Sequence, residues 1–218
     1  MDEIMHDATL PPVPGSERAG AVLDPMLRSI IDGTLAAGAE LRVSAWAARL
    51  GVRVSAVDDA IVRMSYLGLV ERDDTDTARL MSFTRHEARQ ELKCWAEMHL
   101  ALISLAAQPS DDMLRRMTRA RDAYAQRVDA GAAADVGAHI AFFGVLRDTS
   151  TSFGLRLAAT AAAYRLRLSE AVLPQDPRAT KTLHDAVLAA MVSDRRSFDI
   201  EVAFRTWGGA LTGEPLGW

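Results

Sequence analysis

The sequence predicts a mainly α-helical protein, with an N-terminal winged helix-turn-helix domain followed by a C-terminal antiparallel bundle of six helices. Two observations lead to this fold class. Residues 22–83 show three helical patterns and then two short strand patterns around a polar turn. Beyond Thr84 the composition changes to Ala, Leu, Arg and Glu, with no convincing strand. Of the 218 residues, 49% are hydrophobic and 25% charged, which is typical of globular proteins rather than of disordered chains.

The N-terminal residues 1–18 are predicted to be a disordered tail, because Pro11, Pro12 and Pro14 stand beside Gly15 without any usable periodicity. The winged helix-turn-helix domain is then predicted over 19–83. Its first helix covers 22–31, where apolar residues recur at helical spacing until Asp32-Gly33 ends the segment with turn chemistry.

Two more helices and a hairpin complete this domain. Ser44 is predicted to be the N-cap of a short helix through Leu50, and Ser55 the N-cap of a second helix that ends at Gly68. Two strands are predicted over 69–72 and 78–83, around the acidic turn from Asp73 to Asp76. Helix, helix-turn-helix and hairpin follow each other in the winged-helix order.

Residues 84–218 are predicted to form an all-helical domain. Proline, glycine and polar stretches divide it into six segments with helical periodicity. The predicted helices lie near 85–107, 110–130, 132–147, 151–173, 177–193 and 195–210.

Charge and composition restrict the class of protein. No apolar run reaches the roughly 18 residues that span a bilayer, and the first thirty residues do not resemble a secretory signal, so we expect a cytoplasmic protein without membrane contact. Cys94 is the one cysteine, so an intrachain disulfide is excluded and a metal site would depend on histidines and carboxylates.

Three stretches resemble the winged-helix domain of GntR-type transcription regulators. They are IIDGTLAAGAEL at 30–41, WAARLGV at 46–52 and AIVRMSYLGLV at 60–70. The helical remainder resembles the effector domain of the FCD branch of that family, including Asp135-x-x-x-His139 and His184. The resemblance covers roughly residues 20 to 210. It implies a homodimer that binds DNA and responds to a small metabolite, most simply a carboxylate.

The surface that would contact DNA departs from the family pattern. Where the family presents arginines to phosphates and guanine edges, this sequence has Ser44, Val54 and Asp58. Residues 51–82 hold six acids against four bases, a net charge of −2, although a DNA-facing surface is normally positive. Arg49, Arg53 and Ser55 are the predicted DNA-contacting residues. Asp58 and Asp59 have a second interpretation, as solvated side chains that stabilise the helix through its macrodipole.

The resemblance also implies a divalent metal ion (Zn, Ni, Mn or Fe) bound by Asp135, His139 and His184. The family would place another histidine about 22 residues after His184, where this sequence has none. His99 lies on the apolar stripe of its helix and is either the missing ligand or a buried histidine bonded to a nearby carbonyl.

Arg165 and Arg167 follow the alanine-rich stretch at 158–163. Either one of them faces inward and binds the carboxylate of a ligand, or both are exposed.

Two main functions follow. The first is a metabolite-responsive, DNA-binding regulator of the GntR/FCD type. The second is a repurposed relative that has lost DNA binding and uses a metal or another cofactor for catalysis in the pocket of the helical domain. A ligand-binding or partner-binding protein with neither activity is a third. Replacement of Arg49 or Arg53 would impair the regulator, whereas replacement of His139 or His184 would impair the enzyme.

Overall fold

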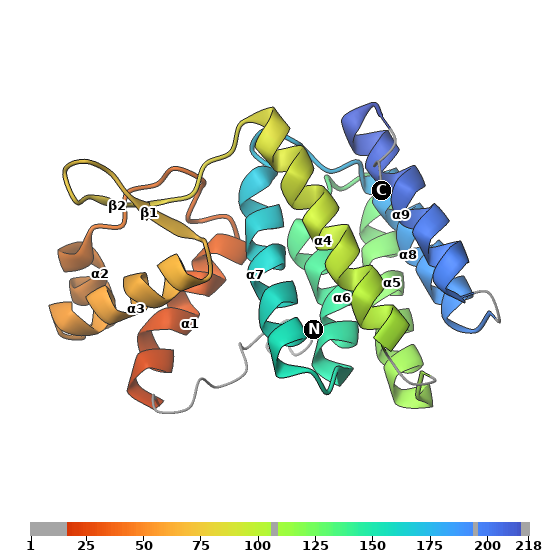
Figure 1. The fold of residues 1–218 in the computed structure, drawn as a ribbon, viewed down its shortest axis with the longest axis horizontal. Helices are drawn as coiled ribbons and strands as arrows, with labels where there is room; N and C mark the ends of the chain where they lie inside the picture. Colours follow the sequence, from red (N-terminus) through yellow and green to blue (C-terminus); the bar gives the residue numbers. More distant parts are fainter. Residues whose placement is uncertain (1–16, 106–108, 194–195, 215–218) are drawn as a thin grey trace.

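The computed structural model describes residues 17–105, 109–193 and 196–214, and shows a winged helix joined to a helical bundle. Figure 1 places α1, α2, α3 and the two strands on one side, the bundle on the other, and α7 between them. Residues 1–16 of the predicted tail lie outside the described residues. Glu17 and Arg18, also assigned to that tail, begin the first helix instead.

The winged helix has the predicted element order. It consists of α1 (Glu17–Ile31), α2 (Val43–Leu50), α3 (Val54–Tyr66), β1 (Val70–Arg72) and β2 (Ala78–Leu80). The strands pair antiparallel, with Val70 opposite Leu80, and Glu40 adds an isolated bridge to Arg79. Its core consists of apolar residues at the predicted helical spacing, among them Val22, Met26, Val57, Ile61 and Met64, all with 0% exposure.

Both serine caps predicted in this domain are wrong. Helix α2 begins at Val43 and α3 at Val54, so the N-cap positions are Arg42 and Arg53, and neither side chain makes a capping hydrogen bond. Buried Leu41, Trp46 and Val57 pack into the core around these two starts. The packing of these apolar residues, rather than a serine hydroxyl, therefore sets where the helices begin.

The bundle also agrees with the prediction: six helices follow Thr84 within the described residues. They are α4 (Arg85–Leu105), α5 (Asp111–Asp129), α6 (Val136–Thr149), α7 (Phe153–Ser169), α8 (Pro177–Met191) and α9 (Arg196–Thr212). In contrast to α2 and α3, α5 to α8 have side-chain N-caps, provided by Ser110, Asp135, Ser152 and Asp176. Among the described residues, no helix is long and apolar enough to cross a membrane.

Helix α7 joins the two parts of the molecule. Its Tyr164 and Leu168 are buried in the core of the winged helix. Arg167 Nε donates a hydrogen bond of 3.0 Å to the carbonyl oxygen of Ile31, the last residue of α1. Gly33, two residues later, has φ of +78°, and a Cβ atom there would collide with Arg167 Nη2. The winged helix therefore packs against α7 through a buried apolar contact and an arginine that lies against a glycine turn.

Candidate functional site

The exposed face of α3, which would enter the DNA groove in a winged helix, carries apolar and acidic side chains. Val54, Val62 and Tyr66 are 52%, 44% and 86% exposed. Asp59 is exposed and Asp58 is half-buried on the same helix. Neither aspartate lies in the first turn, which contains no acid, so the macrodipole gives them little stabilisation. The face can offer apolar contacts to bases but little positive charge to phosphates.

The three predicted DNA-contacting residues differ in what they contact. Arg49 stacks over Trp46, with its guanidinium carbon 4.4 Å from the ring centroid, and its Nη2 donates to Ser29 Oγ at 3.3 Å. Arg53 and Ser55 are exposed at the N-terminus of α3. All three are exposed, but Arg53 and Ser55 are open to a phosphate, whereas the guanidinium of Arg49 already contacts Trp46 and Ser29 of its own domain.

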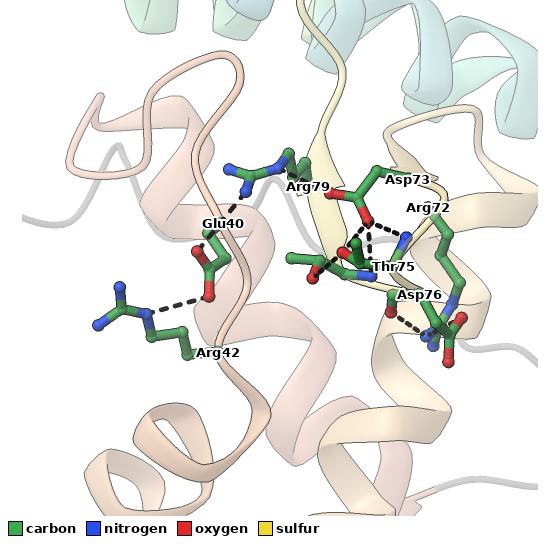
Figure 2. A network of polar contacts seen from close by, with 8 residues as sticks. Glu40, Arg42, Arg72, Asp73, Thr75, Asp76 and Arg79 are labelled. Atoms are coloured by element: carbon green, nitrogen blue, oxygen red, sulfur yellow. Dashed lines mark hydrogen bonds and ion pairs between the residues drawn. The ribbon is translucent and has the colours of Figure 1, made fainter.

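The arginines of the wing pair with its carboxylates (Figure 2). Arg79 lies 3.3 Å from Asp73 and 3.8 Å from Glu40, and Arg72 lies 3.0 Å from Asp76. Arg42 lies 3.1 Å from Glu40. Because such exposed pairs contribute only about 0 to 1 kcal/mol each, a phosphate could compete for the arginines. Three arginines against three carboxylates nevertheless leave this network without net charge.

Asp73 organises the turn of the wing. Its Oδ1 accepts hydrogen bonds from Thr75 Oγ1 at 2.5 Å, from the Thr75 amide at 2.9 Å and from the Thr77 amide at 3.0 Å. These bonds, with that of the Thr75 hydroxyl the strongest, lower the pKa of Asp73 to about 2. The acidic turn in the sequence is therefore a hydrogen-bonded loop. An aspartate two residues before a threonine is the sequence pattern that could have predicted it.

The histidines predicted as metal ligands are buried in the bundle. His139 Nδ1 and His184 Nε2 lie 2.9 Å apart in a hydrogen bond between nearly parallel rings. His99 Nδ1 donates to the Trp95 carbonyl oxygen at 2.8 Å, which is the second interpretation given above for this residue. Burial is the main cause that lowers the pKa of His184 to about 3, that of His99 to about 4, and that of His139 well below 6.5. All three imidazoles are therefore neutral at pH 7.

Asp135 stands just before the first residue of α6, and its carboxylate bonds to groups other than His139. It is the N-cap of α6: its Oδ1 accepts a hydrogen bond from the Ala138 amide at 2.9 Å, and its Oδ2 pairs with Arg127. Within the described ranges, no three His, Cys, Asp or Glu side chains come together as a metal-binding group. A zinc site needs three or four protein ligands, and the four predicted residues, as arranged, do not form such a set.

Aromatic side chains fill the space around the histidine pair. Trp207 lies 5.2 Å from His139 between ring centroids, and it follows Thr206, the position where the family pattern would place a further histidine. Trp95 lies 4.8 Å from His139, and Phe142 stacks on His184 at 4.1 Å. The described side chains around the histidine pair thus form a packed aromatic core.

Arg165 and Arg167 lie at the joint between α7 and the winged helix, so neither interpretation given above describes them. Arg165 Nε pairs with Glu91 Oε2 at 2.8 Å, and a Cβ atom at Gly68 would lie 3.0 Å from Arg165 Nη1. Arg167 binds the end of α1 and pairs with Glu170. Both are half-buried and bound to protein groups, and this geometry does not support their assignment as ligand-binding residues.

Two solved structures share this arrangement of winged helix and bundle. A protein from Rhodococcus sp. RHA1, assigned as a GntR transcriptional regulator, matches with a TM-score of 0.68 and 20% sequence identity, over 90% of this chain and 94% of that one. The chain has the fold of a GntR-type regulator. E. coli McbR/YncC matches with a TM-score of 0.64 and 13% identity, over 89% of this chain and 97% of its own. No family model and no curated protein matches the sequence. The GntR-type fold thus extends across both parts of the molecule, as the resemblance predicted.

Proposed function

We propose that this chain is a transcription regulator that binds DNA through its winged helix as a homodimer. The observation that carries the proposal is the combination of a complete winged helix and a helical bundle in the GntR-type arrangement, along about nine-tenths of both compared chains. In a dimer, two copies of α3 would enter successive major grooves one helical turn apart.

The N-terminus of α3 is the part of this surface best suited to a phosphate. Its N-cap, Arg53, is exposed and leaves the first amide groups without a side-chain cap, and Ser55 adds an exposed hydroxyl. Free amides at a helix N-terminus bind phosphate oxygens without requiring a basic side chain. Val54 and Val62 would then make apolar contacts with base edges, such as thymine methyl groups.

The response to a metabolite is proposed to operate through α7. Because aromatic side chains fill the bundle around His139 and His184, a ligand is better placed where the winged helix meets α7. A ligand that binds one orientation of the winged helix more tightly would shift the separation of the two α3 helices in a dimer.

No observation favours the alternative of catalysis at the histidines. His139 and His184 are 1% and 0% exposed, so a substrate could not reach them without opening the core. The predicted metal stays a prediction from the resemblance, and no step of the proposed function depends on it.

The proposal is tested by gel mobility shift with the DNA upstream of the protein's own coding sequence. We expect Arg53→Ala to weaken binding about tenfold to a hundredfold, the range for loss of a specific arginine contact. Arg178→Ala, an exposed arginine on α8, is the matched control and should bind as the wild type does. Equal binding by the wild type and the Arg53 variant would contradict the proposed contact.

A further inference from the structure

A cavity of about 410 Å3 lies where α1, α5, α6 and α7 meet, outside the aromatic core. This volume is within the range of small-molecule sites, roughly 300 to 1,000 Å3. Ile31, Ile140 and Ala163 give it apolar walls, and the polar part of its lining comes from Arg116, Arg119, Arg147, Asp148 and Tyr164.

Positive charge dominates this cavity. Arg147 has only 7% of its side chain exposed and bonds to Asp148 Oδ1, with Nε at 2.8 Å and Nη2 at 2.7 Å. Arg116 lies 3.9 Å from the other oxygen of the same carboxylate. Arg119 lines the cavity, and no ion pair joins it to another described residue. Two guanidinium groups thus share one carboxylate and the third has none, which leaves a net charge of about +2 in the lining.

Small residues on α6 leave the room beside these arginines. Gly137, Ala141 and Gly144 all line the cavity. A Cβ atom on Gly144 would lie 3.6 Å from Arg147 Nη2, so the buried guanidinium extends across this glycine. A planar group lying along α6 would therefore contact small apolar residues and meet the arginines at one end.

We propose that this cavity binds a small organic carboxylate, with its carboxylate at Arg119 and Arg147 and its apolar body along α6. A guanidinium group binds a carboxylate through two parallel hydrogen bonds, and a largely buried arginine does so with little loss of side-chain freedom. Asp148 fixes the orientation of Arg147 through two bonds, and Arg119 supplies the charge that no described carboxylate neutralises.

The position of the cavity connects it to the winged helix. Ile31 is the last residue of α1, and Tyr164 belongs to the winged-helix core, so a bound molecule would contact both sides of the α7 joint. An effect of the ligand on DNA affinity rests on the proposed function, whereas binding of the ligand does not.

Binding is tested on the full chain by isothermal titration with benzoate, and with benzyl alcohol as an uncharged probe of similar size. We expect one benzoate per chain, and at least tenfold weaker binding of benzyl alcohol. The dissociation constant for benzoate should rise at least tenfold in Arg119→Gln and in Ala141→Leu, which places a side chain in the cavity. Arg178→Gln on α8 is the matched control and should bind benzoate normally.

Absence of benzoate binding at 20 mM, or unchanged binding in both cavity variants, would overturn the proposal. Sedimentation of the wild type and of Ala141→Leu tests whether a second copy of the chain occupies this face. If the wild type is a dimer and the variant is a monomer, the proposal is also overturned. Benzoate binding without any change in DNA affinity would retain the site and remove its regulatory role. DNA binding without benzoate binding would leave the proposed function in place and remove the carboxylate site.

Discussion

At the scale of single residues, the acidic side chains of the wing stabilise its turn and pair with its arginines. Asp73 accepts three hydrogen bonds within the turn and also pairs with Arg79. Because the pKa of its carboxyl is depressed, its contribution to stability is present above the ordinary value of 3.8 and is lost as the pH falls toward 2.

Removal of the strongest of these bonds should be measurable. In Thr75→Ala the pKa of Asp73 should rise from about 2 toward 3.8, because the hydroxyl of Thr75 is the largest cause of the shift. Carboxyl carbon chemical shifts followed through a pH titration give the value. Thr77→Ala keeps its backbone amide as a donor and should change the pKa much less. An unchanged pKa in Thr75→Ala would show that this hydroxyl does not bind the carboxylate.

The buried histidines predict how stability depends on pH. Their pKa values are lower in the folded protein than in the unfolded chain, so the unfolded chain binds more protons as the pH falls below 6.5. The free energy of unfolding should decrease from pH 6.5 toward pH 4, by up to about 1.4 kcal/mol per pH unit for each histidine.

Urea unfolding at pH 7.5 and pH 5.0 tests this dependence. His184→Phe, which can still stack on Phe142, should lose less stability between the two pH values than the wild type. His86→Ala removes an exposed histidine from α4 and serves as the control, with the pH dependence of the wild type. Equal losses for the wild type and His184→Phe would mean that this histidine is not held neutral.

At the scale of elements, variants of Asp135 distinguish its role as the cap of α6 from a role as a metal ligand. Asparagine is as good an N-cap as aspartate, whereas alanine is not. We expect Asp135→Ala to lose about 1 kcal/mol of stability and Asp135→Asn to lose much less, both measured by urea unfolding. Metal analysis of the same samples provides the second measurement. Stoichiometric metal in the wild type that Asp135→Asn loses would contradict the assignment as a cap.

The helices could be predicted well from the sequence because their apolar spacing and their proline and glycine breaks are local signals. Helix α8 begins at Pro177, as predicted, and α5 and α9 each end within two residues of the predicted positions. The sequence around a capping residue does not show which groups its side chain will bond to. Asp135 and His139 are four residues apart, yet Asp135 turns to the amide of Ala138 and to Arg127. Spacing therefore predicts a pair of ligands for one metal, whereas the fold gives the carboxylate two partners that spacing does not indicate.

At the scale of the whole molecule, the joint at α7 determines how the winged helix sits on the bundle. Arg167→Ala removes the hydrogen bond to the Ile31 carbonyl, which should destabilise the joint by about 1 to 2 kcal/mol. Gly33→Ala should disturb it more, because the new methyl group would collide with Arg167 and because φ is +78°.

Limited proteolysis of the α3–β1 and wing turns is the measurement for the joint. Cleavage should be faster in both variants, and Gly131→Ala is the control, since it also replaces a glycine with positive φ but nothing lies near its added Cβ. Cleavage of Gly33→Ala at the rate of Gly131→Ala would contradict a role of this turn in the joint.

Contacts between distant positions could not be predicted from the sequence. The count of acids over residues 51–82 indicated a surface without excess positive charge, but the pairing of Arg79 with Glu40, 39 positions away, follows only from the fold. Arg165 and Arg167 illustrate the same limit, since their partners Glu91 and Ile31 come from other helices. Pattern predicts which residues are buried or exposed, whereas the partner of an arginine depends on tertiary structure.

DNA binding by the winged helix is the central claim, and its salt dependence is the most direct test. Fluorescence anisotropy would compare the protein's own upstream DNA with an unrelated duplex between 50 and 200 mM salt. Because few arginines face the DNA without a carboxylate partner, we predict preferential binding whose affinity falls only about tenfold to a hundredfold over this range, whereas six to ten phosphate contacts would give about 10³ to 10⁵. No binding to either duplex at 50 mM salt would contradict the claim.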